Sequence, residues 1–316
     1  MEKKTTEVRR KAGETLVWVT AFGLTGASAF NSLQLPAQAQ SPQGKNQKKS
    51  GGQAHHQKLR LVSLAPSNTE LLAALKAQDS LVGVCTYCDF PASVSQVTKA
   101  GTFVSANLEK LKSLHPDYVL LVSGQEALAA TLDRNHFQTI MLENKKLEDI
   151  GKNILQLGRL LGKEEEATNL KTKLDKELAA FREENGKKSQ TSVFYCVWPK
   201  PLMTVGSGSF LDEVITACGG RNIAGQIKNA YPTYSLEKLV MQNHDVIILP
   251  HEAKGQSFLK QAPWKDLKAV KESRVFFQPE PRNDMLARPT YRIMEGLNWL
   301  AERLHPQESI AAVRKQ

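Results

Sequence analysis

Two of the four cysteines lie three positions apart, in Cys85-Thr86-Tyr87-Cys88, and this spacing can serve redox or zinc chemistry. A zinc site would need a second pair of ligands at a suitable spacing, whereas Cys196 and Cys218 are far apart in the sequence. We therefore expect a structural or incidental role for Cys85 and Cys88. In an exported protein some of the four thiols can pair, and the sequence does not specify which.

The seven histidines offer little for a metal site. Zinc or manganese would need several His, Asp or Glu ligands that come from both halves of the protein. His115 and His244 precede predicted strands, whereas only His251 follows one, and His136 has no clear place. A zinc or manganese binding protein is therefore kept as an alternative, and we expect neither a metal site nor a cofactor.

Glu109 and Glu237 occupy matching positions in two copies of one pattern. Residues 107–111 read Asn-Leu-Glu-Lys-Leu, residues 235–239 read Ser-Leu-Glu-Lys-Leu, and each copy leads to an Asp followed by an apolar run. The Asn or Ser can cap a short helix, and the apolar run predicts a buried strand. A carboxylate in the first helical turn is favoured by the helix dipole alone. Alternatively, Glu109 and Glu237 are matched docking points for a two-fold symmetric partner.

The two copies begin 128 positions apart, a period that suits two similar lobes rather than a solenoid. Each lobe is predicted to be a small α/β layer structure, in which strands alternate with helices. We place the N-terminal lobe at residues 59–146 and the C-terminal lobe at residues 187–316. Between them, residues 147–186 have a helical pattern that is broken at Gly162, and the second part is long enough to connect the lobes as a stiff helix.

The first 58 residues indicate export. Residues 1–39 combine a basic start, an apolar run and an Ala37-Gln38-Ala39 cleavage site, as in a cleavable signal peptide. No Cys lies near that site, which argues against a lipid anchor there. Residues 40–58 are rich in Gln, Gly, Ser and Lys, and this composition predicts a disordered linker. The net charge of +10 falls to +4 from Leu59 onward, so the charge gives little support for nucleic-acid binding.

Several stretches together resemble the class III periplasmic binding proteins of ATP-binding-cassette importers, and the vitamin B12 binding proteins most of all. The resemblance runs from about Leu59 to the last predicted helix. It implies two Rossmann-like α/β lobes joined by a single long helix, with a ligand in the cleft between them. The stretches that carry it are 64–71 (LAPSNTEL), 87–91 (YCDFP), 107–110 (NLEK), 206–213 (GSGSFLDE), 219–223 (GGRNI), Tyr231-Pro232 and Arg288-Pro289.

The resemblance also implies roles for individual residues. Glutamates at the positions of Glu109 and Glu237 dock on arginines of a dimeric membrane permease. The predicted ligand contacts are Tyr87, Phe103, Trp198, Tyr231, Asp284 and Arg288. Phe103 and Tyr231 stand where the B12 proteins often have Trp, which leaves the identity and affinity of the ligand open. Each aromatic residue can also belong to the core, although aromatic walls suit a large flat ligand.

We therefore expect a monomeric periplasmic protein that delivers cobalamin or a related corrinoid to an importer. Haem or a ferric siderophore is the alternative within the same class, although siderophore binders present several cations and Arg288 alone makes no strongly basic cleft. An exported enzyme is not expected, because no nucleophile with its base, no recognisable carboxylate pair and no phosphate-binding loop stands out.

Overall fold

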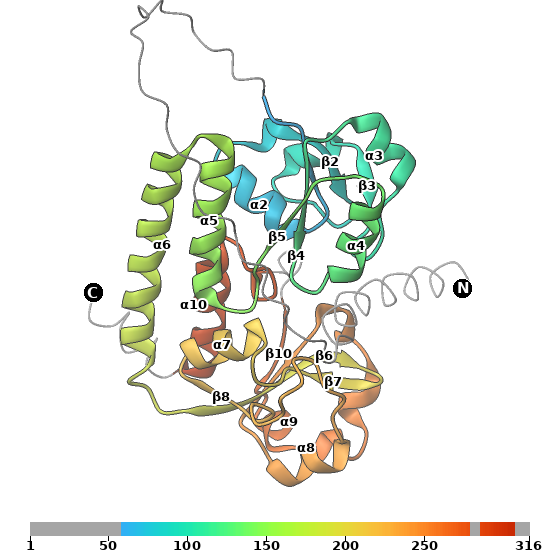
Figure 1. The fold of residues 1–316 in the computed structure, drawn as a ribbon. Helices are drawn as coiled ribbons and strands as arrows, with labels where there is room; N and C mark the ends of the chain where they lie inside the picture. The colour runs from blue at the N-terminus through green and yellow to red at the C-terminus, as the bar shows by residue number, and fades with distance from the viewer. Residues whose placement is uncertain (1–57, 279–284, 307–316) are drawn as a thin grey trace, which may run out of the picture.

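The computed structural model describes residues 58–278 and 285–306. In Figure 1 these residues form two α/β lobes, one above the other, with long helices along one side. The predicted signal peptide, the predicted linker up to residue 57 and Asp284 lie outside the described residues. The structure thus has the predicted α/β class with two lobes.

The first lobe contains a parallel sheet with the strand order β3-β2-β1-β4-β5. The order reverses between β1 and β4, which makes the carboxyl ends of these two strands a topological switch point. β1 and β4 are almost entirely buried because helices cover both faces of a parallel sheet. The elements of this lobe are β1 (Leu61–Ser63), α2 (Pro66–Ala74), β2 (Leu81–Cys85), β3 (Lys99–Gly101), α3 (Leu108–Leu114), β4 (Tyr118–Val122), α4 (Glu126–Arg134) and β5 (Thr139–Leu142).

The second lobe is built on a mixed sheet with the order β10-β9-β6-β7, in which β8 also pairs with β6. Successive side chains of β6 alternate between two apolar clusters: Val193 and Tyr195 face one, and Phe194 and Cys196 face the other. Both faces of this strand are therefore buried. The elements are β6 (Thr191–Pro199), β7 (Leu202–Thr204), α7 (Phe210–Ala217), β8 (Gly220–Asn222), α8 (Leu236–Gln242), β9 (Val246–Leu249), α9 (Lys268–Lys271), β10 (Val275–Phe277) and α10 (Ile293–Leu304).

Helices α5 (Leu147–Leu161) and α6 (Glu164–Asn185) pack against each other and follow the first lobe in the chain. The predicted break is confirmed: Gly162 ends α5 with φ of 64°, a left-handed conformation that suits glycine. Helix α6 has 22 residues, or roughly 33 Å at 1.5 Å per residue. It runs along both lobes in Figure 1 and leads into β6. Among the described helices, none has the length and apolar character that a membrane crossing requires.

The repeated helix and strand are confirmed. Asn107 and Ser235 cap α3 and α8 by accepting hydrogen bonds from the third residue beyond them, and both helices are seven residues long. The aspartates that follow also match. Asp117 Oδ2 accepts from the N–H of Arg60 at 2.6 Å, and Asp245 Oδ2 accepts from that of Ser192 at 2.9 Å. In each lobe the Asp therefore links the start of one strand to its neighbour.

Candidate functional site

The loops after the strands of the first lobe are tied together by one buried amide. Gln125 follows β4, and its Nε2 donates to the carbonyl of Leu64 after β1, at 3.1 Å, and to the carbonyl of Phe103 after β3. Its Oε1 accepts from the N–H of Val122 at 2.8 Å. The amide thus joins three loops at the carboxyl edge of the sheet, which is where ligands bind in open α/β sheets.

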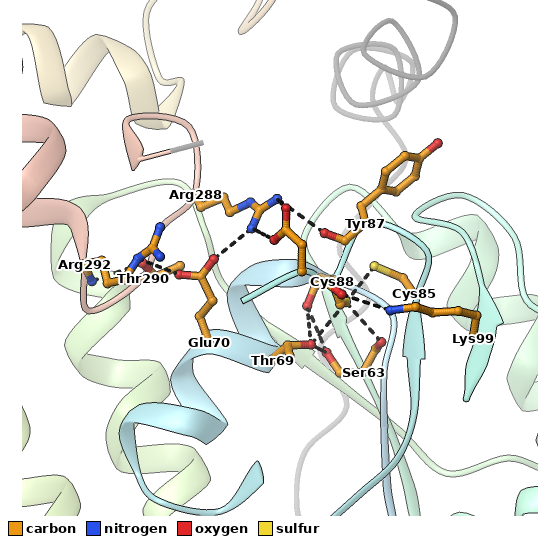
Figure 2. Close-up of polar contacts among 12 residues, drawn as sticks. Ser63, Thr69, Glu70, Cys85, Tyr87, Cys88, Lys99, Arg288, Thr290 and Arg292 are labelled. Atoms are coloured by element: carbon orange, nitrogen blue, oxygen red, sulfur yellow. Dashed lines mark hydrogen bonds and ion pairs between the residues drawn. The ribbon is translucent and has the colours of Figure 1, made fainter. Parts of the chain in front are cut away.

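Tyr87 lies in a tight turn at the end of β2. The N–H of Cys88 donates to the carbonyl of Cys85 at 3.1 Å, which closes the turn around Thr86 and Tyr87. The Tyr87 ring is half-buried, and Figure 2 shows it pointing away from the polar contacts beneath it. An aromatic ring in this position offers a partly open face that can contact a ligand.

Arg288 joins this turn to a distant part of the chain. Its Nη1 is 2.9 Å from Glu70 Oε1 and 2.6 Å from Asp89 Oδ1, and its Nη2 donates to the carbonyl of Tyr87 at 3.3 Å (Figure 2). The side chain is buried, with 7% of the residue exposed. The structure thus brings the predicted ligand residues Tyr87 and Arg288 together, and it places the guanidinium group between two carboxylates.

Arg292 belongs to the same network of charged side chains. Its Nε lies 3.3 Å from Glu70 Oε2, and its guanidinium carbon lies 3.8 Å from the centre of the Phe90 ring, as in a cation–π contact. Burial raises the pKa of Glu70, and the attraction of Arg288 and Arg292 opposes this shift. We call Glu70, Asp89, Arg288 and Arg292 the charge cluster.

The amino-acid sequence alone predicts no role for Glu70, Asp89 or Arg292. One signal was present: Glu70 lies beside Leu71 and Leu72 in an apolar helix, where an acid needs a partner. The partner itself could not be inferred, because Arg288 is 218 positions away.

The remaining predicted contacts are distributed over both lobes. Phe103 is buried in the core with 1% exposure. Trp198 is half-buried at the end of β6, and its indole N–H donates to the carbonyl of Lys200 at 2.8 Å. Tyr231 is half-buried, and burial raises its pKa to about 12. Asp284 lies outside the described residues.

Trp198 and Tyr231 belong to neighbouring segments of the second lobe. Trp198 pairs with Met203 of β7, and Met203 forms a bridge to Thr233, two residues after Tyr231. His251 follows β9, and its Nδ1 lies 3.2 Å from the carbonyl of Gln278. Within residues 58–278 and 285–306, no three His, Cys, Asp or Glu side chains gather as metal ligands would.

Glu109 and Glu237 are both exposed in the first turn of their helices. The Glu109 carboxylate is 3.5 Å from Lys112 Nζ, and its side chain is 86% exposed. Glu237 accepts from the hydroxyl of Ser235, and hydrogen bonds from this hydroxyl and from its own backbone N–H lower its pKa. Figure 1 shows α3 and α8 at the outer ends of the two lobes. The two carboxylates are therefore accessible and carried by different lobes.

Comparison with known proteins identifies the family to which this two-lobed fold belongs. Residues 61–281 match the family model described as periplasmic binding protein, and the chain belongs to this family. The family and the relatives found are binding proteins rather than enzymes. This confirms the expectation from the sequence that the protein is not an exported enzyme.

The individual relatives narrow the class. An uncharacterized ABC transporter substrate-binding lipoprotein, YvrC of Bacillus subtilis, is 30% identical over 258 residues, which cover 78% of this chain and 80% of the relative. A vitamin B12-binding protein of Vibrio vulnificus is 28% identical, and the match covers 77% of this chain and 89% of that protein. The crystal structure of the periplasmic vitamin B12 binding protein BtuF of Vibrio cholerae superposes with a TM-score of 0.69 at 25% identity. The superposition covers 78% of this chain and 96% of BtuF.

A periplasmic haem-binding protein, RhuT of Roseiflexus, superposes with a TM-score of 0.71 at 19% identity, and the superposition covers 79% of this chain and 99% of RhuT. At that identity the likeness concerns the fold alone. The chain is thus a substrate-binding protein of the periplasmic binding protein family, and its relatives include vitamin B12-binding proteins.

Proposed function

We propose that this protein binds cobalamin or a related corrinoid in the periplasm and delivers it to the dimeric permease of an ABC importer. The observation that carries the proposal is the similarity to vitamin B12-binding proteins, which extends over about three quarters of the chain in sequence and in structure. Export would depend on the signal peptide predicted at residues 1–39.

The chemistry of the strand ends is consistent with such a ligand. Tyr87, Trp198 and Tyr231 are half-buried aromatic residues from both lobes, and flat rings give a large contact area with little loss of conformational entropy. Arg288 is held by two carboxylates, so its positive charge is already balanced. This balance favours a ligand that is not strongly anionic over a ferric siderophore.

The test is a titration of the protein that begins at Gln40 with cyanocobalamin, followed by Trp fluorescence and calorimetry. Haemin and a ferric siderophore serve as comparison ligands. Saturable one-to-one binding of cyanocobalamin at micromolar or lower concentration is the expected result. Saturation by haemin or the siderophore alone would mean that this compound, and not a corrinoid, is the ligand. No binding of any of the three would contradict the proposal.

A pair of variants tests the aromatic contact. Tyr87→Leu should weaken cyanocobalamin binding about threefold to tenfold, because an aromatic contact contributes about 0.5–1.5 kcal/mol beyond its buried area. Tyr291→Leu is the matched control: this ring is also half-buried but lies 5.8 Å from Lys173 Nζ of α6. Equal affinity of both variants and the parent would remove Tyr87 from the proposed site.

A further inference from the structure

The two thiols that enclose the Tyr87 turn lie in direct contact. Cys85 Sγ and Cys88 Sγ are 2.8 Å apart, and the two residues are 0% and 1% exposed. Cys85 ends β2, and Cys88 closes the turn, so the backbone already holds the side chains on the same side (Figure 2). Neither thiol has a role in the function proposed above.

The spacing of the sulfur atoms favours a bond between them over a shared metal ion. Two thiolates on one tetrahedral zinc ion, each about 2.3 Å from the metal, are about 3.8 Å apart. A disulfide needs about 2.05 Å. From 2.8 Å, the sulfurs would have to separate by about 1 Å to admit zinc, or approach by less than 1 Å to form a bond.

The surroundings make the two thiols chemically different. Burial opposes ionisation of Cys88, but hydrogen bonds from the Cys85 thiol and from Thr69 Oγ1, at 3.2 Å, outweigh burial and lower its pKa. Burial and donation to Cys88 both raise the pKa of Cys85. Because the thiolate is the reactive form, we expect Cys88 to be the thiol that is oxidised first. Cys85 would then form the bond to the oxidised Cys88.

We propose that Cys85 and Cys88 form a reversible disulfide that locks the turn carrying Tyr87, and that a peroxide closes it and a dithiol reopens it. Hydrogen peroxide is small enough to reach a buried thiol after a slight opening of the turn. An oxidising compartment outside the cytoplasm, which the family membership indicates, is where such a bond persists.

The reaction balances in two steps. The Cys88 thiolate attacks one oxygen of hydrogen peroxide, the O–O bond breaks, and the departing hydroxide takes up a proton to form water, which leaves a sulfenic acid on Cys88. Cys85 Sγ then attacks Cys88 Sγ, the S–OH bond breaks, and the hydroxyl leaves as water with the Cys85 proton. Two thiols and one peroxide thus give one disulfide and two waters.

The experiment maps the thiols of the full chain. The protein is reduced with dithiothreitol, freed of reductant, treated with hydrogen peroxide, denatured, alkylated and digested for mass spectrometry. We expect the peptide that contains Cys85 and Cys88 to be unalkylated and lighter by two hydrogens, and to regain both alkylation sites after reduction. Two of the four thiols should therefore disappear.

Cys196 and Cys218 are internal controls within the same molecule. Both are buried free thiols, and burial raises the pKa of each. They should stay alkylatable at peroxide concentrations that close the Cys85–Cys88 bond. Full alkylation of Cys85 and Cys88 after treatment, or oxidation of all four thiols at one rate, would overturn the proposal.

Two further measurements separate the steps. In Cys85→Ser, Cys88 has no partner, so its sulfenic acid should accumulate and react with dimedone, whereas Cys88→Ser should give no such adduct. Hydrogen exchange of the parent protein tests the locking: amides of residues 86–89 should exchange more slowly in the oxidised form. Equal exchange in both forms would contradict the locked turn while leaving the disulfide established.

Discussion

Arg288 shows how much one side chain can depend on its partners. Transfer of the Glu70 carboxylate from water into this site is unfavourable, and its pKa is raised even with Arg288 and Arg292 beside it. Removing one partner of such a buried pair typically costs about 3–5 kcal/mol, because the other charge is left uncompensated. The charge cluster therefore attaches the segment before α10 to the first lobe, and it holds the Tyr87 turn through Asp89.

His244 predicts a pH-dependent loss of stability. Its ring is buried near Phe194, with 5.7 Å between ring centres, and burial lowers its pKa to about 4 from 6.5. Between these values the unfolded chain binds more protons, so stability is lost as the pH falls below 6.5. The loss from this one group should reach about 2 kcal/mol at pH 5, measured by urea unfolding of the parent against His244→Leu.

The control for this prediction is His136→Asn. His136 is exposed and has φ of 62°, a backbone conformation that Asn tolerates well. Its unfolding free energy should follow the parent across the same pH range, whereas His244→Leu should fall less steeply. Parallel curves for all three proteins would show that His244 is not the group responsible.

At the level of elements, α5 and α6 approach each other closely at Gly158. A Cβ on Gly158 would lie 2.3 Å from the Cβ of Ala167 and 3.1 Å from the carbonyl oxygen of Lys163. Gly158→Ala should therefore destabilise the protein by about 1–3 kcal/mol through overpacking, although alanine is the better helix former. Thermal unfolding followed by circular dichroism gives the change.

A double-mutant cycle isolates the contact itself. Ala167→Gly alone should cost about 1 kcal/mol of helix propensity, but in the Gly158→Ala background it also removes the clash between the two Cβ atoms. The double variant should then be more stable than the sum of the two single changes predicts. Additive effects would mean that the helices adjust and that the close approach at Gly158 carries no energy.

What could be predicted from the sequence was local. The caps Asn107 and Ser235, the Gly162 break and the strands after Asp117 and Asp245 are encoded within a few residues, and all were found. The short strands β3, β7 and β8 were not predicted, because three residues carry no periodic pattern. The charge cluster and the burial of Phe103 depend on contacts between distant segments, which propensity and spacing do not report.

At the scale of the whole molecule, each lobe carries one exposed glutamate in the first turn of a matching helix. Helices α3 and α8 carry Glu109 and Glu237 at the outer ends of the lobes, and the pair α5–α6 connects the lobes on one side (Figure 1). A single chain built this way could contact both halves of a two-fold symmetric permease with the same kind of side chain. We propose that Glu109 and Glu237 dock on the permease when the protein delivers its cargo.

Reversal of both charges, Glu109→Lys with Glu237→Lys, should abolish uptake in cells that depend on this protein and leave cargo binding unchanged. A matched control is Glu165→Lys with Glu166→Lys. These exposed acids also lie in the first turn of a helix, α6, so the helix dipole imposes a similar cost of about 0.3–1 kcal/mol per residue. Loss of uptake in the first variant alone would assign the effect to position rather than to net charge or stability. Normal uptake in the first variant would refute the docking role, and the two glutamates would then be ordinary helix-terminal acids.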